Sequence, residues 1–478
     1  MKIADYLLET LASCGVRTVF GNPGTTEIPL LAAFAGRDDL RYVVALSEVA
    51  AVPMADGYAR ASRSLGVVNL HVAPGLGNGM GALYTAGIAK TPLLVLVGGQ
   101  DRRLTHTAPV LYGPLERMAG SVCKTVLRLD SEHDAAASIR NAVRSALTPP
   151  FGPVALVCPP DLLAREIDAR PLPIAAPRLG GLRTSEAEAI ARRLCEADAP
   201  AFVATEDVHW HGASAVLRAL AEALDAPVYA APYTGVLPVD ADSPAFAGYL
   251  SPSFAAIGER LRAHDLVVFL GGRTLRTTLY SVLELPQPKL WLGDDPALLA
   301  LDGEYEAAHL VDLDAALSQV ASSVHEQGRS RHAPLRGHRP EVLLPDPGGA
   351  RFHPTAAIHA LLHAFPDALV FDEAGLSTSD VRQSMSCAAG HYVTNGSGGI
   401  GWGLAASVGG AIARPERQVL AIIGDGSALY ASEALWSAGH EGARLLLVVL
   451  SNRRYATLNA AATRLTGSVM PAFTLEPP

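Results

Sequence analysis

The stretch LAIIGDGSALYASEALWSAGHEGARLLLVVLSNRRY, residues 420–455, contains two apolar segments that each run into a polar turn. The first segment ends in Gly-Asp-Gly-Ser and the second in Ser-Asn-Arg-Arg, and the residues between them have an amphipathic, helical pattern. This order predicts two parallel strands joined by a helix. Because the carboxyl ends of neighbouring parallel strands meet at one edge of a sheet, we expect Asp425 and Asn452 to converge although they lie 27 positions apart.

Asp425 stands in a glycine turn, where the backbone would otherwise suit a phosphate. A bound Mg²⁺ would allow a carboxylate and a phosphate to lie side by side, since the ion takes oxygen ligands and commonly shares its coordination shell with phosphate oxygens. The Asp425 carboxylate, the Asn452 amide oxygen and the Arg454 peptide carbonyl would then be ligands. The residues expected to approach the phosphates are Gly424, Gly426 and Ser427. Two ordinary strand-to-helix turns would explain the same residues, so this pattern alone leaves both interpretations open.

Short β-branched runs alternate with longer helical patterns through most of the chain, which is typical of βα units on a parallel sheet. Proline-rich stretches at 169–183 and 325–354 interrupt this alternation and predict linkers. The strand candidates of the first block are RTVFG (17–21), YVVAL (42–46), GVVNLH (66–71), PLLVLVGG (92–99) and GPVALVCPP (152–160), and those of the second are PAFVATED (200–207), APVYAAPYT (226–234), DLVVFLGGR (265–273) and KLWLGDD (289–295), so each block supplies about five; the last block supplies three or four. We therefore expect an α/β fold of three consecutive parallel-sheet domains, at 1–168, 184–324 and 350–478.

The composition excludes several classes of protein. A hydrophobic share of 49% with 18% charged residues indicates a globular protein, and a net charge of −9 argues against a nucleic-acid partner. The five cysteines are scattered without paired spacing, which is typical of a reducing compartment. The amino terminus does not have the pattern of a signal peptide, and no apolar run reaches membrane-spanning length. We expect a soluble cytoplasmic enzyme with no membrane partner.

The segment NGSGGIGWG, residues 395–403, contains a formal G-x-G-x-x-G pattern. A nucleotide-dependent dehydrogenase is one interpretation, because such glycines hold a dinucleotide pyrophosphate after a strand. A single match is weak evidence in a chain with 44 glycines. The alternative is a loop whose backbone must pass close to something bulky.

GDG followed by Ser451 and Asn452 closely resembles the thiamine-diphosphate signature, whose usual form ends in a pair of asparagines. Asn452 matches the metal-ligating asparagine of the pair, and Ser451 replaces the other. The amino-terminal third resembles the same superfamily, in the branch of 2-oxo acid decarboxylases and acetolactate synthases. The stretches that look most like benzoylformate decarboxylases are VFGNPGTTEIPLL (19–31), ALSEVAAVPMADGYARASR (45–63) and VNLHVAPGLGNGMGAL (68–83).

This resemblance covers essentially the whole chain and implies both fold and function. The three domains would be the pyrimidine-binding, central and diphosphate-binding domains. Thiamine diphosphate with Mg²⁺ (or Ca²⁺) would be held between the first domain of one subunit and the third of another, in a homodimer or a dimer of dimers (a homotetramer). The implied reaction is non-oxidative decarboxylation of a 2-oxo acid through a C2 ylide and an enamine.

The resemblance implies three catalytic residues. Glu48 matches the glutamate that hydrogen-bonds the aminopyrimidine ring and favours the imino tautomer that removes the C2 proton. His71 matches a histidine that handles protons near the substrate, and Thr25 stands where a serine contacts the substrate carboxylate. Two of the three have a structural alternative: Glu48 as an exposed residue at a helix start, and His71 as an ordinary strand-end side chain.

Further residues are implied to hold the cofactor. Ile400 matches the aliphatic residue that wedges between the cofactor rings, and the glycines around it would let the backbone approach closely. Glu373 and Gly375 lie in a loop expected near the diphosphate. The full cofactor-binding set is Glu48, Gly375, Gly398, Ile400, Gly424, Asp425, Gly426, Ser427, Asn452 and Tyr455, with Asp425, Asn452 and Arg454 on the metal.

Two departures from the family pattern bear on function. Benzoylformate decarboxylases carry a second catalytic histidine in the central domain, about where this chain has Thr277 and Thr278. Threonine does not relay protons near neutral pH, so slow protonation of the enamine would favour its capture by a second carbonyl compound. Family members also continue beyond the position of Pro478, so the third domain is expected to be truncated.

Two alternatives to the decarboxylase therefore stay open. One is a carboligase of the acetolactate synthase type, and the other is a catalytically inactive cofactor-binding subunit. The substrate is equally open, because the loop 101–113 forms a pocket wall in the family. Its charged residues Arg102, Arg103 and His106 would either recognise an acidic group or simply be solvated.

Overall fold

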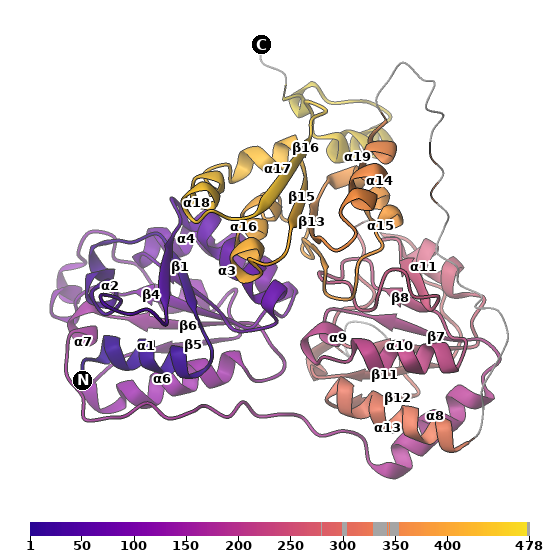
Figure 1. Cartoon of the computed structure of the whole chain (residues 1–478), viewed down its shortest axis with the longest axis horizontal. Helices are drawn as coiled ribbons and strands as arrows, with labels where there is room; N and C mark the ends of the chain where they lie inside the picture. The colour runs from indigo at the N-terminus through magenta and orange to yellow at the C-terminus, as the bar shows by residue number, and fades with distance from the viewer. Residues whose placement is uncertain (279, 299–303, 328–341, 343, 345–352, 476–478) are drawn as a thin grey trace. The chain divides into compact units, whose positions relative to one another are not determined.

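The computed structural model divides into two compact units, one formed by residues 1–177 and 397–478 and the other by residues 178–396. Each unit contains a six-stranded parallel sheet (Figure 1). Among the residues described, no helix is long and apolar enough to cross a membrane. The structure describes the whole chain except residues 279, 299–303, 328–341, 343, 345–352 and 476–478.

The sheet of the first unit has the strand order β2-β1-β3-β4-β6-β5. Since the chain changes its winding direction between β1 and β3, the loops after β1, β2 and β3 meet at one carboxyl edge. The strands are β1 (Thr18–Gly21), β2 (Arg41–Val44), β3 (Gly66–Leu70), β4 (Leu93–Gly98), β5 (Thr125–Arg128) and β6 (Pro153–Cys158). The helices are α1 (Ile3–Ser13), η1 (Thr25–Glu27), α2 (Ile28–Ala32), α3 (Glu48–Ser62), α4 (Val72–Ile88), η2 (Arg102–Thr107), α5 (Leu115–Ala119), α6 (Glu132–Ala146) and α7 (Pro160–Leu163).

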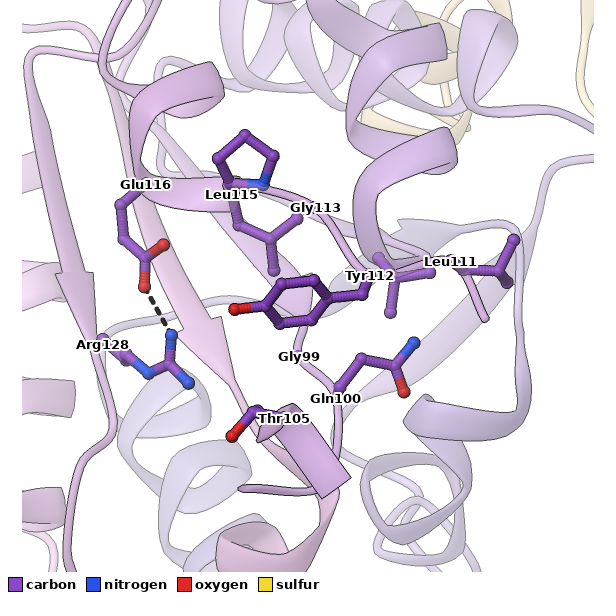
Figure 2. Close-up of a pocket in the computed structure, with 11 residues that line it drawn as sticks. Gly99, Gln100, Thr105, Leu111, Tyr112, Gly113, Leu115, Glu116 and Arg128 are labelled. Atoms are coloured by element: carbon purple, nitrogen blue, oxygen red, sulfur yellow. Dashed lines mark hydrogen bonds and ion pairs between the residues drawn. The ribbon is translucent and has the colours of Figure 1, made fainter. Parts of the chain in front are cut away.

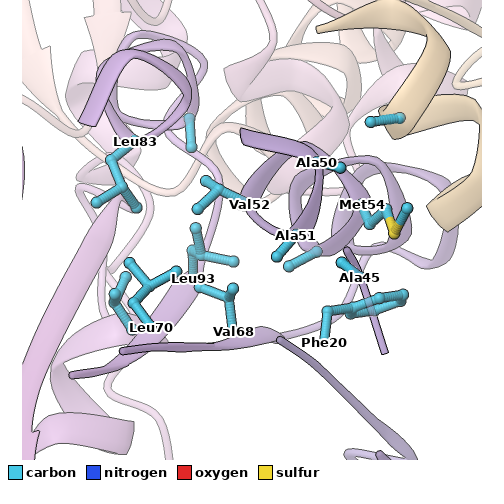
Figure 3. Packing of buried hydrophobic residues seen from close by; sticks show 14 of the residues in the cluster. Phe20, Ala45, Ala50, Ala51, Val52, Met54, Val68, Leu70, Leu83 and Leu93 are labelled. Carbon is cyan, nitrogen blue, oxygen red and sulfur yellow. The ribbon is translucent and has the colours of Figure 1, made fainter. Parts of the chain in front are cut away.

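Helices cover both faces of this sheet, because successive strand residues point to opposite sides. Val19 and Val67 pack with α1 and α6 on one face. Phe20 and Val68 pack on the other face in a cluster that includes Met54 of α3 (Figure 3). The continuous apolar runs of these strands therefore reflect burial on both sides.

Helix α3 also packs along α16 (Gly403–Ala413) in the same unit. A Cβ added at Gly57 would collide with the backbone of Ala406, and one added at Gly409 would collide with the backbone of Met54. The two helices therefore touch backbone to backbone. The remaining elements of this unit are β15 (Val419–Gly424), α17 (Asp425–Tyr430), α18 (Ala434–His440), β16 (Leu445–Leu450), α19 (Ala456–Thr466) and η5 (Pro471–Phe473), with β15 and β16 paired in parallel.

The sheet of the second unit has the order β12-β11-β10-β7-β8-β9, the doubly wound arrangement of alternating α/β units. Its strands are β7 (Pro200–Ala204), β8 (Val228–Ala230), β9 (Phe246–Tyr249), β10 (Leu266–Leu270), β11 (Lys289–Gly293) and β12 (Ala307–Leu310). Its helices are α8 (Thr184–Glu196), α9 (Asp207–Trp210), α10 (Ser214–Ala223), α11 (Phe254–Leu261), η3 (Pro296–Leu298) and α13 (Leu313–Glu326). The unit also contains α14 (Pro354–Ala364), β13 (Leu369–Glu373), η4 (Gly375–Ser377), α15 (Thr378–Ser384) and β14 (Tyr392–Thr394), with β13 and β14 paired in parallel.

The parallel-sheet α/β fold expected from the sequence is confirmed, but both large sheets have six strands where about five were expected. The strands that the pattern does not predict are β5, β9 and β12. Each lies at an edge of its sheet, where one side faces no neighbouring strand. Their residues are mostly half-buried or mixed in character, so they lack the continuous apolar run that marks the central strands.

His211 is a buried histidine at the end of α9 in the second unit, with its side chain 1% exposed. Its Nε2 lies 3.2 Å from Asp294 Oδ2, and its Nδ1 lies 3.2 Å from Asp312 Oδ2. Burial by itself lowers the imidazole pKa, but the two carboxylates more than offset this and raise the pKa to about 9. The protonated ring therefore joins α9 to the ends of two other segments of this unit.

We expect the ion pairs of His211 with Asp294 and Asp312 to stabilise the folded protein near neutral pH and to be lost in alkali. The folded-state pKa lies above the unfolded value of about 6.5, so the stabilisation is complete below that pH and is lost as the pH rises through about 9. It should reach on the order of 3 kcal/mol of unfolding free energy. Urea unfolding of the wild type and His211→Gln across this pH range checks it: their difference should shrink in alkali, and a constant difference would contradict the assignment.

Candidate functional site

Asp425 lies where β15 passes into α17, and its carboxylate faces the turn that follows β16. Oδ2 accepts hydrogen bonds from the backbone N–H groups of Asn452 at 3.0 Å and Arg453 at 2.7 Å. Oδ1 accepts one from Gly426 N–H at 2.9 Å. The two strand ends therefore meet at Asp425, as the spacing predicts.

The groups around Asp425 suit a hard cation. Asn452 Oδ1 lies in the same turn, where it accepts a hydrogen bond from Arg454 N–H at 3.0 Å. The described residues contain no group of three or more His, Cys, Asp or Glu side chains arranged for a metal. A cation here would rely on one carboxylate, neutral amide and carbonyl oxygens and the oxygens of a bound phosphate, which is a set that Mg²⁺ or Ca²⁺ accepts. Tyr455 packs its ring against Gly426 beside this set.

Glu48 is the first residue of α3 and follows the capping residue Ser47. It is only 4% exposed, although a glutamate at a helix start usually faces solvent. Asn78 Nδ2 donates a hydrogen bond to Glu48 Oε2 at 3.2 Å. A Cβ added at Gly75 of α4 would lie 2.5 Å from Glu48 Oε1, so α4 provides room for the carboxyl group only because it carries glycine there.

His71 caps the start of α4 and pairs with a carboxylate that the sequence pattern does not predict. Its Nδ1 lies 2.7 Å from Glu27 Oε2, and the Glu27 side chain is 2% exposed. Thr26 Oγ1 donates to Glu27 Oε1 at 2.6 Å, and Gly24 N–H donates to Oε2 at 3.0 Å. Glu27 is therefore fixed on both oxygens and holds the imidazole by Nδ1, which leaves Nε2 as the nitrogen available for proton exchange.

Glu27, Glu48 and His71 follow β1, β2 and β3, three adjacent strands of one sheet. The pKa of Tyr42 is raised mainly by burial and further by the negative charges of Glu27 and Glu48, so both glutamates lie near this side chain. Thr25 starts η1 beside this group and is exposed. The carboxyl edge of the first sheet thus gathers the three residues predicted to be catalytic, together with Glu27.

Val72, the residue after His71, adopts a left-handed backbone conformation with φ of 42°. For a β-branched residue this costs about 1–3 kcal/mol. The strain arises because β3 ends at Leu70 and α4 begins at Val72, so the chain turns within two residues. Val72 also lines a pocket with Gln100, Thr105 and Tyr112 from the loop after β4 (Figure 2).

The two arginines of the loop 101–113 already have partners. Arg102 Nε donates to Asp161 Oδ2 at 2.9 Å, and Arg103 Nη2 donates to Asp101 Oδ2 at 2.6 Å. His106 is exposed. These pairings support a structural and solvated role for the loop charges over recognition of an acidic substrate group.

The glycine segment expected beside the cofactor precedes α16. Gly398 and Gly401 have φ values of 82° and 90°, and a Cβ at Gly401 would collide with the ring of Tyr430. Ile400 between them is 40% exposed. Gly375 follows β13, where Glu373 is the last residue, and has a φ of 61°.

The predicted site residues of the first unit thus fall into two groups. One comprises Glu48, His71 and Thr25 at the edge of the first sheet, and the other comprises Asp425, Asn452 and their neighbours after β15 and β16. In the part of this unit that the structure describes, no hydrogen bond or ion pair links Glu48 to Asp425. Gly424 ends β15, and Ser427 lies buried in α17.

Comparisons with known proteins agree with this geometry. Three family models match the chain: the thiamine pyrophosphate enzyme amino-terminal binding domain at residues 1–119, the central domain at 187–318 and the carboxyl-terminal binding domain at 373–472. Benzoylformate decarboxylase of Pseudomonas aeruginosa is 33% identical over 94% of this chain and 86% of its own length. The acetolactate synthase large subunit of Lactococcus lactis is 23% identical over 94% of this chain and 80% of its own length.

Solved structures give the same assignment. A thiamine diphosphate-dependent 4-hydroxybenzoylformate decarboxylase of Rhodococcus jostii RHA1 matches with a TM-score of 0.89 and 29% identity, over all of this chain and 91% of its own. Benzoylformate decarboxylase of Polynucleobacter necessarius matches with a TM-score of 0.92 and 26% identity, over all of this chain and 90% of its own. Because the models of all three expected α/β domain types match, the chain belongs to the family of thiamine pyrophosphate enzymes that includes 2-oxo acid decarboxylases and carboligases.

Proposed function

We propose that this protein decarboxylates a 2-oxo acid with thiamine diphosphate and Mg²⁺, in the manner of the benzoylformate decarboxylases. The observation that carries the proposal is the burial of Glu48 at 4% exposure, with an amide donor on Oε2 and a glycine facing Oε1. Burying a carboxyl group is costly unless polar partners compensate it. The aminopyrimidine nitrogen of the cofactor would be such a partner.

Each group of residues then has a task. Asp425, Asn452 and the Arg454 carbonyl hold the cation, while Gly424, Gly426 and Ser427 approach the phosphates. When bound, thiamine diphosphate supplies the electron sink for the bond that breaks as carbon dioxide leaves. Glu48 holds a proton against the aminopyrimidine ring, His71 Nε2 moves a proton near the substrate carbonyl, and the Thr25 hydroxyl contacts the substrate carboxylate.

Glu27 gives a direct test of the His71 role. We expect Glu27→Gln to lower kcat about 10- to 100-fold and to shift the pH–rate profile, because an amide does not favour the imidazolium as a carboxylate does. The dissociation constant for thiamine diphosphate should not change, since Glu27 contacts His71 and not the cation turn. Steady-state rates across pH measure this effect. Glu306→Gln, on an exposed carboxylate paired with Arg193, is the control, and an unchanged profile in Glu27→Gln would contradict the role.

A second candidate is carboligation. The segment after β10 carries Thr277 and Thr278 where the resemblance expects a histidine, and residues 271–298 contain no histidine. Without imidazole there, protonation of the reacting carbon would be slow, and an added aldehyde would compete for it. Rapid aldehyde release with no coupling to an added acceptor would exclude this candidate.

The deciding experiment is product analysis of the purified protein. Aromatic and aliphatic 2-oxo acids would be supplied with thiamine diphosphate and Mg²⁺, with and without aldehyde acceptors, and released carbon dioxide and carbon products measured. Removal of the cation with a chelator should abolish turnover, and added Mg²⁺ or Ca²⁺ should restore it. Absence of cofactor binding and of turnover on every acid would refute the proposal.

We also propose that the enzyme works as a homodimer or homotetramer in the cytoplasm. The resemblance to the family supports a site shared between subunits, in which each chain would supply Glu48 to one site and Asp425 to another. The absence of paired cysteine spacing supports a reducing compartment. Ultracentrifugation with and without the cofactor tests the assembly.

A further inference from the structure

Arg276 lies in the segment after β10, two positions before Thr278, and its side chain is 18% exposed. Its Nη1 donates a hydrogen bond to the Gly396 carbonyl oxygen at 2.7 Å. Its Nη2 donates one to the Tyr233 carbonyl oxygen at 2.9 Å. A planar guanidinium presents several donors in fixed directions, so this one side chain joins two backbone segments that are far apart in the sequence.

The two segments that Arg276 joins already run side by side. Leu237 N–H donates to the Tyr392 carbonyl oxygen at 3.0 Å, and Thr394 N–H donates to the Gly235 carbonyl oxygen at 2.9 Å. These bonds attach β14 to the loop after β8. Arg276 closes the same attachment at its far end, where β14 gives way to the glycine segment.

A buried carboxylate helps to set the direction of the guanidinium. Glu206 Oε1 lies 3.9 Å from Arg276 Nη2, and the Glu206 side chain is 2% exposed. Glu206 Oε2 accepts a hydrogen bond from Gly235 N–H at 3.3 Å. The negative charge therefore lies beside the loop that receives the second Arg276 hydrogen bond, and it favours an arginine whose guanidinium points inward.

We propose that Arg276 is a positioning residue for the cofactor: it fixes the backbone at Gly396, where the glycine segment 396–401 that carries Ile400 begins. Gly396 is the first glycine of the segment, and Ile400 follows four positions later. The inference rests on the proposed function, because it takes Ile400 as the residue that supports the bent cofactor. Arg276 itself would touch neither substrate nor cofactor.

The test compares Arg276→Met and Arg276→Lys in the full-length protein. Thiamine diphosphate binding in the presence of Mg²⁺ is measured by calorimetry, and amide exchange of residues 392–402 by mass spectrometry. We expect Arg276→Met to weaken binding about 10- to 100-fold and to speed exchange in this segment, as losses of supporting contacts commonly do. Arg276→Lys should recover only part of both effects, because an ammonium keeps the charge beside Glu206 without the planar fork.

Arg273→Met is the matched control, because Arg273 lies three positions earlier and is exposed. It should bind and exchange like the wild type. Arg276→Met with wild-type affinity and exchange would overturn the inference, and so would full recovery in Arg276→Lys, which would assign the effect to charge alone. If the wild type itself binds no thiamine diphosphate, the proposed function fails, and the exchange data alone then decide whether Arg276 holds the segment.

Discussion

Glu48→Gln is expected to lower turnover of a 2-oxo acid by about 10²- to 10⁴-fold while thiamine diphosphate still binds. Glutamine keeps the size of the side chain and an oxygen that can accept from Asn78, so the start of α3 should stay intact. It has no acidic proton to share with the aminopyrimidine ring, so activation of the cofactor should fail. Steady-state rates and calorimetric titration with the cofactor separate the two effects.

The matched control is Glu132→Gln. Glu132 is the first residue of α6 and follows a capping serine, as Glu48 does in α3, but its side chain is 38% exposed. Loss of a helix-start charge therefore applies to both variants, and only Glu48→Gln should lose activity. An inactive cofactor-binding subunit would give no turnover in the wild type and no change in either variant. Wild-type rates in Glu48→Gln would exclude a catalytic role for this carboxyl group.

The sequence predicts the fold well where strands are buried on both faces. Central strands such as β4 and β6 read as continuous apolar runs, so their number and order along the chain follow from the pattern. The edge strands β5, β9 and β12 are not predicted, because their residues are mostly half-buried or mixed in character and do not form continuous apolar runs. The domain boundaries at 1–168, 184–324 and 350–478 stay a prediction, since the structure divides into two compact units rather than three.

The candidate site is predictable where topology alone brings residues together. Asp425 and Asn452 end adjacent parallel strands, so their meeting follows from the strand order. The sequence does not predict Glu27, because its partner His71 lies 44 positions away, beyond β2 and β3, although the place of Glu27 in η1 between β1 and α2 is a usable signal. The role of Arg276 is not predicted for a different reason: its hydrogen-bond acceptors are backbone carbonyl oxygens, which every residue has and which the sequence therefore does not mark.

Asp425→Ala is expected to weaken binding of thiamine diphosphate in Mg²⁺ by at least about 100-fold and to abolish turnover. The variant removes the proposed site's one carboxylate ligand and the acceptor for the backbone N–H groups of Asn452 and Arg453. The turn around Asn452 is exposed, so the thermal unfolding midpoint should change little. Calorimetry with the cofactor at several Mg²⁺ concentrations measures the loss.

Two further variants distinguish binding of the cation by the Asp425 charge from ordering of the turn by the Asp425 hydrogen bonds. Asp425→Asn keeps an oxygen that can accept the N–H groups but has no charge for Mg²⁺, so it should lose binding nearly as completely as the alanine variant. Ser451→Ala should bind almost normally, because the Ser451 hydroxyl lies 3.4 Å from Asp425 Oδ2, a long hydrogen bond. Wild-type affinity in Asp425→Asn would mean that Asp425 only orders the turn, and the cation would then have to lie elsewhere. The expected order, with both Asp425 variants weak and Ser451→Ala strong, would instead attribute cofactor binding to the carboxylate charge.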